Sequence, residues 1–170
     1  RAVEFDVRQL KDQSLVVMHD DNFARTTGQS KALQECTHCE LTNYNQAFHW
    51  KNWPQFEVTP CLQQTLNVIH DFEHIELEVK SVTNFSEAEQ LALHLQQQLK
   101  GFENTLIITS FDLKIHQVLH THQLGFKQGL LIEEPIGQQA IDRALALGCQ
   151  QIGWMDSLAT DELIQASQAA

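Results

Sequence analysis

The sequence predicts an α/β fold in which helices cover a parallel sheet and, within that class, a (β/α)8 TIM-type barrel. Short apolar runs alternate with amphipathic helical stretches, as expected when a helix follows each strand. The runs are too apolar to face water, which favours buried parallel strands. The alternative is an open doubly wound sheet. Such a sheet usually carries a glycine-rich phosphate loop, and neither G-x-G-x-x-G nor G-x-x-x-x-G-K-[ST] occurs here.

One charged strand favours the barrel over the open sheet. Residues 75–80 read Ile-Glu-Leu-Glu-Val-Lys, and successive side chains of a strand point to opposite faces. The apolar members are therefore expected to meet a helix layer, whereas Glu76, Glu78 and Lys80 share the other face. A sheet with one apolar face under helices and one charged face around a cavity fits a barrel interior near its catalytic end.

The individual elements follow from the same patterns. The apolar runs predict strands at 2–7, 15–18, 75–79, 105–109, 129–132 and 151–154. The amphipathic stretches predict helices at 86–100, 112–123, 137–147 and 160–170, and one more that starts at 59–60. In the helix 86–100, Ser86 and Glu89 form a capping box and Gly101 follows the last turn. In the helix after Pro60, we expect Leu62, Leu66 and Ile69 to face inward.

Length and charge limit the classes of function. The chain has 170 residues, 42% of them hydrophobic, and a formal net charge of -11. This length suits one domain with a core, so we expect residues 1–170 to form a single barrel domain. An acidic surface repels phosphate backbones, which argues against nucleic-acid or anionic-membrane binding. No run of about 18 apolar residues occurs, so stable membrane insertion is not expected.

The cysteines indicate neither a disulfide framework nor a complete zinc site. Four cysteines are too few and too scattered for a framework. Cys36, His38 and Cys39 are zinc-type ligands, but a structural zinc site usually needs a second pair at matching spacing, to which Cys61 alone could contribute. A polar loop with incidental thiols is the favoured interpretation. Because nothing demands disulfides, we expect a cytoplasmic location.

Carboxylates form the first candidate site. Glu4 and Asp6 are two residues apart in the strand at 2–7, so both carboxylates project from one face, about 7 Å apart along the chain. With Glu78 on a neighbouring barrel strand, they would repel one another in a partly desolvated pocket. A hard divalent cation removes that repulsion, and ligation by oxygen alone suits magnesium or calcium. The alternative is an exposed edge strand, because a single E-x-D is common.

His19 is the candidate proton-transfer residue. It follows the run at 15–18, and the carboxyl end of a barrel strand is where catalytic groups collect. An ordinary histidine pKa of about 6.5 suits proton transfer at neutral pH. The other histidines lie mainly in helices or loops, and we assign them no chemistry.

Several segments, taken in order, resemble the glycerophosphodiester phosphodiesterase family. That family reads approximately V-E-x-D-V-x-x-T-x-D-G, then V-V-x-H-D, then R-T-T, with a later N-I-E-I-K strand and an S-F-D strand end. The matching segments are 3–8 (VEFDVR), 11–12 (KD), 16–21 (VVMHDD), 25–27 (RTT), 76–80 (ELEVK) and 110–112 (SFD). Matches in order along most of the chain are far more specific than any one motif.

The resemblance implies a barrel enzyme that hydrolyses glycerophosphodiesters to glycerol 3-phosphate and an alcohol with a divalent metal. By position, Glu4, Asp6 and Glu78 match the metal ligands of the family. His19 matches the second of its two catalytic histidines, and Lys80 matches the lysine that helps to neutralise the phosphate. The metal would hold a phosphate oxygen while His19 protonates the departing alcohol oxygen. The nucleophile is either water or the neighbouring hydroxyl of the glycerol.

The sequence also departs from the family pattern. Leu10 replaces a threonine and Gln13 a turn glycine, so we expect a differently shaped loop. Glu76 replaces an asparagine and adds a negative charge to the pocket. The His-Arg-Gly of the first strand and the tryptophan-rich closing strand are absent.

Typical barrels have about 250 residues, so the sequence predicts strands two to seven of a barrel that is truncated at both ends. We expect bare strand edges near Ala2 and Gln151, and no activity from residues 1–170 alone. The alternative function is a degenerate barrel that binds a phosphodiester or a metal without turnover. A His-Arg pair upstream of Arg1 would favour the enzyme.

Overall fold

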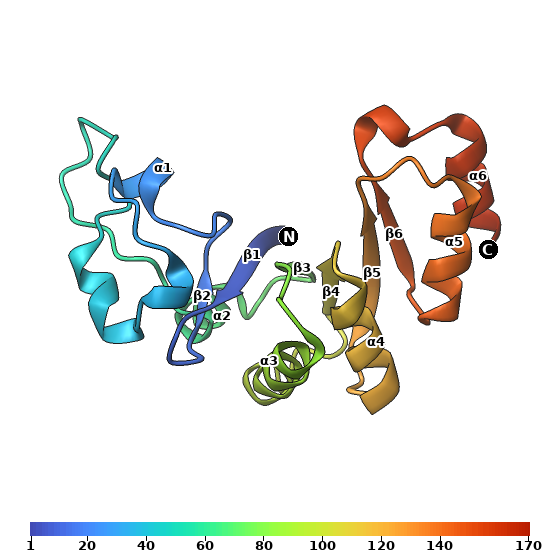
Figure 1. The fold of residues 1–170 in the computed structure, drawn as a ribbon, viewed down its shortest axis with the longest axis horizontal. Coiled ribbons are helices and arrows are strands. Elements are labelled where there is room, and N and C mark those ends of the chain that lie inside the picture. Colours follow the sequence, from blue (N-terminus) through green and yellow to red (C-terminus); the bar gives the residue numbers. More distant parts are fainter. The chain divides into compact units, whose positions relative to one another are not determined.

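The computed structural model describes residues 1–170, and from residue 62 onward helices and strands alternate along the chain (Figure 1). The strands are β1 (Ala2–Gln9), β2 (Leu15–Val17), β3 (His74–Val79), β4 (Leu106–Ser110), β5 (Lys127–Ile132) and β6 (Gln151–Trp154). The α-helices are α1 (Ala24–Thr27), α2 (Leu62–Ile69), α3 (Phe85–Gln98), α4 (Leu113–His122), α5 (Gln138–Ala146) and α6 (Asp161–Ala169). Short 3-10 helices are η1 (Leu33–Glu35), η2 (His38–Asn43) and η3 (Asp156–Leu158). Each predicted strand is present, within a few residues of its predicted bounds.

The chain divides into two compact units. The sheet unit comprises Arg1–Glu4 and Glu73–Ala170, and the hairpin unit comprises Phe5–Phe72. In hydrogen-bonding order the strands are β2-β1-β3-β4-β5-β6, which gives a six-stranded sheet with two ends. None of the helices has both the length and the apolar character that crossing a bilayer requires.

The sheet unit contains the regular part of the fold. Strands β3 to β6 are parallel neighbours, with Glu78 paired to Thr109, Thr109 to Gly129 and Gly129 to Gln151. Paired residues of adjacent strands share a face of the sheet. One continuous face therefore runs from Glu78 across the unit, as the barrel interpretation predicts.

The alternation predicted for β3 is confirmed. Ile75, Leu77 and Val79 are all 0% exposed, whereas Glu76 and Glu78 are only partly buried. The apolar positions pack in the core and leave the acidic positions on the other face. The pattern of burial thus fixes the direction of the Glu78 side chain.

Two glycines allow the strands to pack closely on the face that carries Glu78. A Cβ atom at Gly153 would lie 2.7 Å from Cδ2 of Leu131, and one at Gly129 would lie 2.9 Å from Cγ2 of Thr109. Real Cβ atoms do not approach other atoms so closely. Larger neighbours therefore fill the space that side chains at these two positions would need.

The helices confirm the predicted apolar faces, but two starts differ by a residue or two. Helix α3 is capped by Asn84, whose Oδ1 accepts the Glu87 N–H at 3.0 Å, so the cap is not Ser86. Asn84 has the extended backbone that lets its side chain reach the first turn. In α2 the residue that caps the helix is Cys61, which follows Pro60.

The hairpin unit departs from the parallel expectation. Strand β2 pairs antiparallel with β1, with Val7 opposite Val17 and Gln9 opposite Leu15. The predicted strand at 15–18 exists, but it is the second strand of a hairpin. The connection at 10–14 explains the difference, because a parallel crossover needs about a dozen residues or more. Strand β2 pairs with residues 7–9 of β1. This part of β1 is therefore not the unpaired strand edge that the sequence led us to expect near Ala2.

The turn of this hairpin keeps a left-handed residue where the family has glycine. Gln13 has φ 69°, a conformation that glycine adopts readily. The turn is closed by the Leu10 N–H, which donates to the Ser14 carbonyl at 2.9 Å, and by the Gln13 N–H, which donates to the Leu10 carbonyl at 2.9 Å. Asp12 also accepts the Ser14 N–H at 3.2 Å. These bonds hold Gln13 in the turn despite its side chain.

The rest of the hairpin unit is irregular but has its own core. The Phe23 and Tyr44 rings stack with centroids 4.2 Å apart. Apolar side chains from the hairpin and from the 3-10 helices pack with them: Leu10, Val16, Met18, Leu33, Cys36 and Leu41. Cys36 is thus a core residue, and burial raises its pKa. Cys39 is exposed, so these two thiols lie in different environments.

Candidate active site

The three carboxylates expected to bind a metal come together. One carboxylate oxygen from each of Glu4, Asp6 and Glu78 lies within 4.8 Å of the other two. Glu4 and Asp6 are alternate residues of β1, so their side chains leave the same face of the strand. Glu78 is the second-last residue of β3, which neighbours β1 in the sheet order. Strand alternation therefore produces this acidic cluster.

The spacing of these oxygens fits a divalent cation. Two oxygens bound to one calcium ion at about 2.3–2.6 Å lie at most about 5 Å apart, and two on magnesium about 4 Å apart. The 4.8 Å limit of the cluster suits calcium and requires little closure for magnesium. The donors are all carboxylate oxygens, which are the ligands that hard cations prefer. The cluster is thus chemically suited to hold one such ion.

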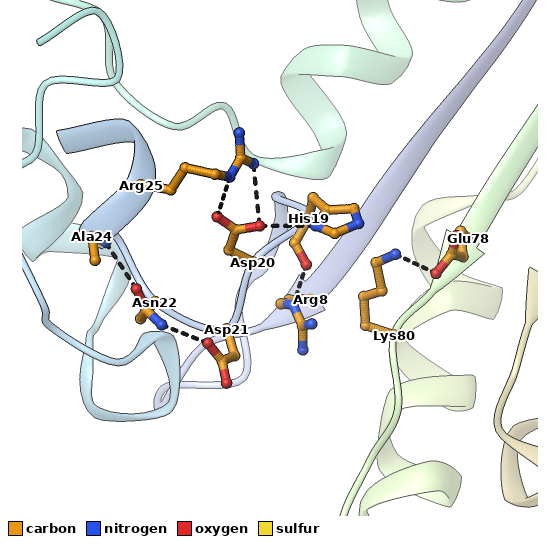
Figure 2. A network of polar contacts seen from close by, with 9 residues as sticks. All are labelled: Arg8, His19, Asp20, Asp21, Asn22, Ala24, Arg25, Glu78 and Lys80. Carbon is orange, nitrogen blue, oxygen red and sulfur yellow. Dashed lines mark hydrogen bonds and ion pairs between the residues drawn. The ribbon is translucent and has the colours of Figure 1, made fainter. Parts of the chain in front are cut away.

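Lys80 lies beside this cluster, directly after β3. Its ammonium forms an ion pair with Oε1 of Glu78, and the two side chains are only 12% and 13% exposed (Figure 2). A shielded ammonium needs such a partner, because the loss of its hydration is costly. Lys80 therefore places a positive charge where the carboxylates would otherwise repel one another.

The end of β3 is held by the S-F-D segment, which begins at Ser110, the last residue of β4. The Ser110 hydroxyl donates to the Val79 carbonyl at 2.7 Å, and an Asp112 oxygen accepts the Val82 N–H at 3.0 Å. Asp112 also caps α4 by accepting the Lys114 N–H at 2.9 Å. Burial alone would raise the pKa of Asp112, but these two N–H donors and the Lys114 ammonium lower it. The match at 110–112 therefore fixes the backbone that carries Lys80.

Glu76 has partners of its own in the sheet unit. Its Oε1 lies 3.0 Å from Nε2 of His74 and accepts a hydrogen bond from Nε2 of Gln151 at 3.1 Å. Glu76 is not a member of the acidic cluster of Glu4, Asp6 and Glu78. The negative charge that replaces the family asparagine is therefore held within a separate polar network.

The hairpin places His19 beside β1. The Met18 N–H donates to the Asp6 carbonyl at 3.0 Å, and Nε of Arg8 donates to the His19 carbonyl at 2.9 Å. The expectation that His19 ends a parallel barrel strand is wrong, because it follows an antiparallel one. The hairpin register nevertheless returns the chain to the level of Asp6. The His19 side chain is 65% exposed and free to meet a ligand.

The polar contacts around the His19 ring involve two residues to which sequence reasoning gave no role, Asp20 and Arg25. Nδ1 of His19 lies 2.8 Å from Oδ1 of Asp20 (Figure 2). Arg25 donates to both oxygens of Asp20, from Nε at 2.6 Å and from Nη2 at 3.1 Å. The Arg25 guanidinium lowers the pKa of Asp20 most, and the His19 contact lowers it further against the effect of burial. In the sequence, the aspartate directly after His19 and the arginine that follows at position 25 were the features that could have predicted these contacts.

Local bonds position Arg25 on the single turn of α1. The turn begins where Oδ1 of Asn22 accepts the Ala24 N–H at 2.8 Å (Figure 2). It ends at Gly28, whose φ of 72° is the left-handed conformation that glycine favours. The buried Thr27 hydroxyl donates to the Phe23 carbonyl at 2.8 Å. The R-T-T match is therefore a compact turn that presents Arg25.

Comparison with known proteins gives one family and several similar structures. The sequence profile of the Glycerophosphoryl diester phosphodiesterase family matches residues 1–170. No curated protein matches the chain.

The solved structures show the fold that the chain shares. A phosphodiesterase from Oleispira antarctica, in complex with the product sn-glycerol-3-phosphate, has a TM-score of 0.86 at 20% identity over 99% of this chain and 69% of that one. A glycerophosphodiester phosphodiesterase from Agrobacterium tumefaciens has a TM-score of 0.74 at 19% identity over 99% and 70%. One from Thermotoga maritima has a TM-score of 0.70 at 22% identity over 98% and 67%. The predicted TIM-barrel class is confirmed, with a sheet here that does not close.

Proposed function

Because this chain belongs to the glycerophosphoryl diester phosphodiesterase family, we propose that it hydrolyses glycerophosphodiesters to glycerol 3-phosphate and an alcohol with Mg²⁺ or Ca²⁺. The observation that carries the proposal is the convergence of the Glu4, Asp6 and Glu78 carboxylates within 4.8 Å. The Oleispira antarctica relative holds sn-glycerol-3-phosphate as its product, which is one of the two products proposed here.

In this proposal the charged residues bind the cation and, with it, the phosphate of the substrate. Glu4, Asp6 and Glu78 would hold the cation, which when bound would draw charge from a phosphate oxygen. Lys80 would offset the phosphate charge through its ammonium. Its pairing with Glu78 keeps this ammonium at the cluster before the substrate arrives. A phosphodiester carries one negative charge, so a cation and a lysine suit it.

His19 supplies the proton. As the bond from phosphorus to the alcohol oxygen breaks, the departing oxygen takes a proton from the His19 imidazolium. The new bond to phosphorus forms from water, which releases a proton to the solvent, or from the neighbouring glycerol hydroxyl, which does the same. In the second case a cyclic phosphate forms first, and water must then open it to give glycerol 3-phosphate. His19 is 65% exposed, so a bound substrate can reach it.

The metal role is tested by Glu78→Gln, with Glu76→Gln as the matched control from the same strand face. Glu78→Gln removes one ligand charge, so we expect at least 10-fold weaker Mg²⁺ or Ca²⁺ binding and a loss of kcat/KM of about 10²–10⁴-fold. Calorimetric titration with each metal salt and release of glycerol 3-phosphate from glycerophosphocholine by the intact protein measure the two effects. Unchanged metal binding in Glu78→Gln would contradict the ligand role. Substrate binding without product release by the wild type would favour the degenerate barrel.

The proton-donor role is tested by His19→Ala, with the exposed His49→Ala as its control. We expect kcat to fall about 10²–10⁴-fold in His19→Ala while metal affinity and melting temperature stay near the wild-type values. His49→Ala should keep full activity. A loss of activity in His19→Ala that parallels a loss of folding would indicate a structural histidine instead.

We further propose a cytoplasmic location from the cysteine chemistry. All four cysteines are unpaired, and free thiols are maintained in reducing compartments. Thiol titration of the protein, trapped by alkylation in its own cells, should find these cysteines reduced. A protein recovered with oxidised or mixed-disulfide cysteines would contradict this location.

A further inference from the structure

We infer that Asp20 and Arg25 are positioning residues that set the proton-carrying atom and the orientation of His19. The inference rests on the proposed role of His19 as the proton donor. Both residues lie in segments that match the family, yet neither binds the metal or the phosphate in the function proposed above. Figure 2 shows them joined to His19 in one chain of polar contacts.

The imidazole of His19 is held by its contact with Asp20. Oδ1 of Asp20 lies 2.8 Å from Nδ1 of His19, and an ionised carboxylate can only accept a hydrogen bond. Nδ1 must therefore carry hydrogen, both in the imidazolium and after that group has given up a proton. This leaves Nε2 as the atom that donates to the departing oxygen.

The carboxylate of Asp20 is held in turn by Arg25. Arg25 binds Asp20 with two nitrogens, at 2.6 Å to Oδ2 and 3.1 Å to Oδ1. A fork of this kind restricts rotation of the carboxylate, which a single bond would leave free. The Asp20 side chain is only 19% exposed, so water competes little for its oxygens. Arg25 therefore keeps Asp20 ionised and directed at His19.

The backbone of His19 is held separately from its ring. Nε of Arg8 donates to the His19 carbonyl at 2.9 Å, and the Met18 N–H is bonded to the Asp6 carbonyl at 3.0 Å. The main chain and the ring of His19 are thus held by different groups within the hairpin unit. Only the ring depends on Asp20, so the two effects can be separated by mutation.

A purely structural role predicts a different result. The His19 and Arg25 side chains are 65% and 66% exposed, and ion pairs so close to solvent contribute little to folding. If the contacts serve the imidazole, their loss should lower kcat and leave stability and metal binding nearly unchanged. If they serve the fold, stability should fall first.

The decisive variant is Asp20→Asn, with Asp21→Asn as its matched control. The Asp21 carboxylate accepts from Nδ2 of Asn22 at 2.7 Å, so the control changes a neighbouring charge outside the contact with His19. We expect Asp20→Asn to lower kcat about 10–100-fold, with KM within about 2-fold and an unchanged melting temperature. Asp21→Asn should behave as the wild type.

The imidazole can be observed directly by ¹⁵N NMR of the intact protein, with His19 assigned from the signal lost in His19→Gln. In the neutral ring of the wild type we expect hydrogen on Nδ1, whereas Asp20→Asn should give a mixture of tautomers. Arg25→Gln should lower kcat less than Asp20→Asn, and Arg25→Lys should restore part of the loss. If Asp20→Asn fails to fold, these two Arg25 variants test the same positioning role without it.

The outcomes separate this inference from the proposed function. An unchanged tautomer or an unchanged kcat in Asp20→Asn, with His19→Ala inactive, would overturn the positioning role alone. Full activity in His19→Ala would overturn the proton-donor role on which it rests. A tautomer shift together with the kcat loss in Asp20→Asn supports the inference.

Discussion

The sheet unit and the hairpin unit place their functional side chains by different physical means. In the sheet unit, strand alternation and parallel register aim Glu78 away from a core in which Leu77 is 0% exposed. In the hairpin unit, individual hydrogen bonds position the side chains, such as the one from Nδ1 of His19 to Asp20. Side-chain position follows from burial in the first unit and from specific polar partners in the second.

This difference leads to opposite expectations for mutation. A buried leucine of a strand should dominate the stability of the sheet unit, because burial of apolar area is the main favourable term there. In the hairpin unit, small polar residues hold the irregular segments. Asn45 is an example, since its Oδ1 accepts the N–H groups of both Ala47 and Glu57. Polar truncations should therefore cost more there than the loss of exposed aromatic rings.

The largest effect on stability is expected for Leu77→Ala in β3. This side chain is fully buried, so truncation leaves a cavity and should lower the free energy of unfolding by about 3 kcal/mol. Urea unfolding of the intact protein measures the change. Leu93→Ala is the matched control, because Leu93 is 51% exposed on α3 and should change stability by no more than about 0.5 kcal/mol. Equal losses in the two variants would show that burial does not govern the sheet unit.

The next effect is expected for Gly153→Ala in β6. A Cβ atom there would lie 2.7 Å from Cδ2 of Leu131. Only the flexible end of the Leu131 side chain has to move, so the variant should lose about 1 kcal/mol, the low end for overpacking. Leu131→Ala removes the clashing atom. In the Gly153→Ala/Leu131→Ala double variant the cost of the glycine change should largely disappear, which a double-mutant cycle in urea reports. Simple additivity of the two changes would argue against this contact.

The sequence predicted the sheet unit well because its periodic patterns carry the information. The alternation at 75–80 placed Glu78 and Lys80 on the charged face, and the amphipathic spacing predicted the helices at 86–100 and 112–123. The cap of α3 was missed, because Asn84 and Ser86 both precede a glutamate three residues later. Pattern alone does not choose between two such boxes.

The hairpin unit was less predictable, since its geometry depends on contacts without a period. The segment at 10–14 was short enough to predict an antiparallel return, and that signal was overlooked. The 3-10 helices η1 and η2 have no amphipathic repeat from which to predict them. The Arg25 contact with Asp20 depends on the direction of one helical turn, which only the three-dimensional structure shows.

An effect of similar size, but one that depends on pH, is expected for Asp112→Asn in the sheet unit. Burial alone would raise the pKa of the Asp112 carboxyl, but the N–H donors of Lys114 and Val82 and the Lys114 ammonium hold it below its usual range. A depressed folded-state pKa stabilises the protein above the unfolded pKa and ceases to do so as the pH falls through the folded value. We expect Asp112→Asn to cost about 1 kcal/mol at pH 7. The difference from the wild type should shrink below about pH 4, as urea unfolding at pH 7 and pH 3 would show. A difference that grew in acid would contradict the assignment.

The smallest effect is expected for Trp50→Ala in the hairpin unit. Trp50 is 65% exposed, and its edge contact with Trp53, at 5.6 Å between centroids, lies in solvent. The Trp50 N–H bond to the Ala47 carbonyl at 2.9 Å involves only the backbone and survives the change. We therefore expect a loss of no more than about 0.5 kcal/mol in urea unfolding.

Asn45→Ala provides the comparison within the same loop. It leaves two N–H groups without their acceptor and should cost about 1–2 kcal/mol, although far fewer atoms are removed. A Trp50→Ala loss that exceeds the Asn45→Ala loss would show that aromatic packing holds this loop. The hairpin unit would then follow the same rule as the sheet unit, in which the larger apolar truncation costs more.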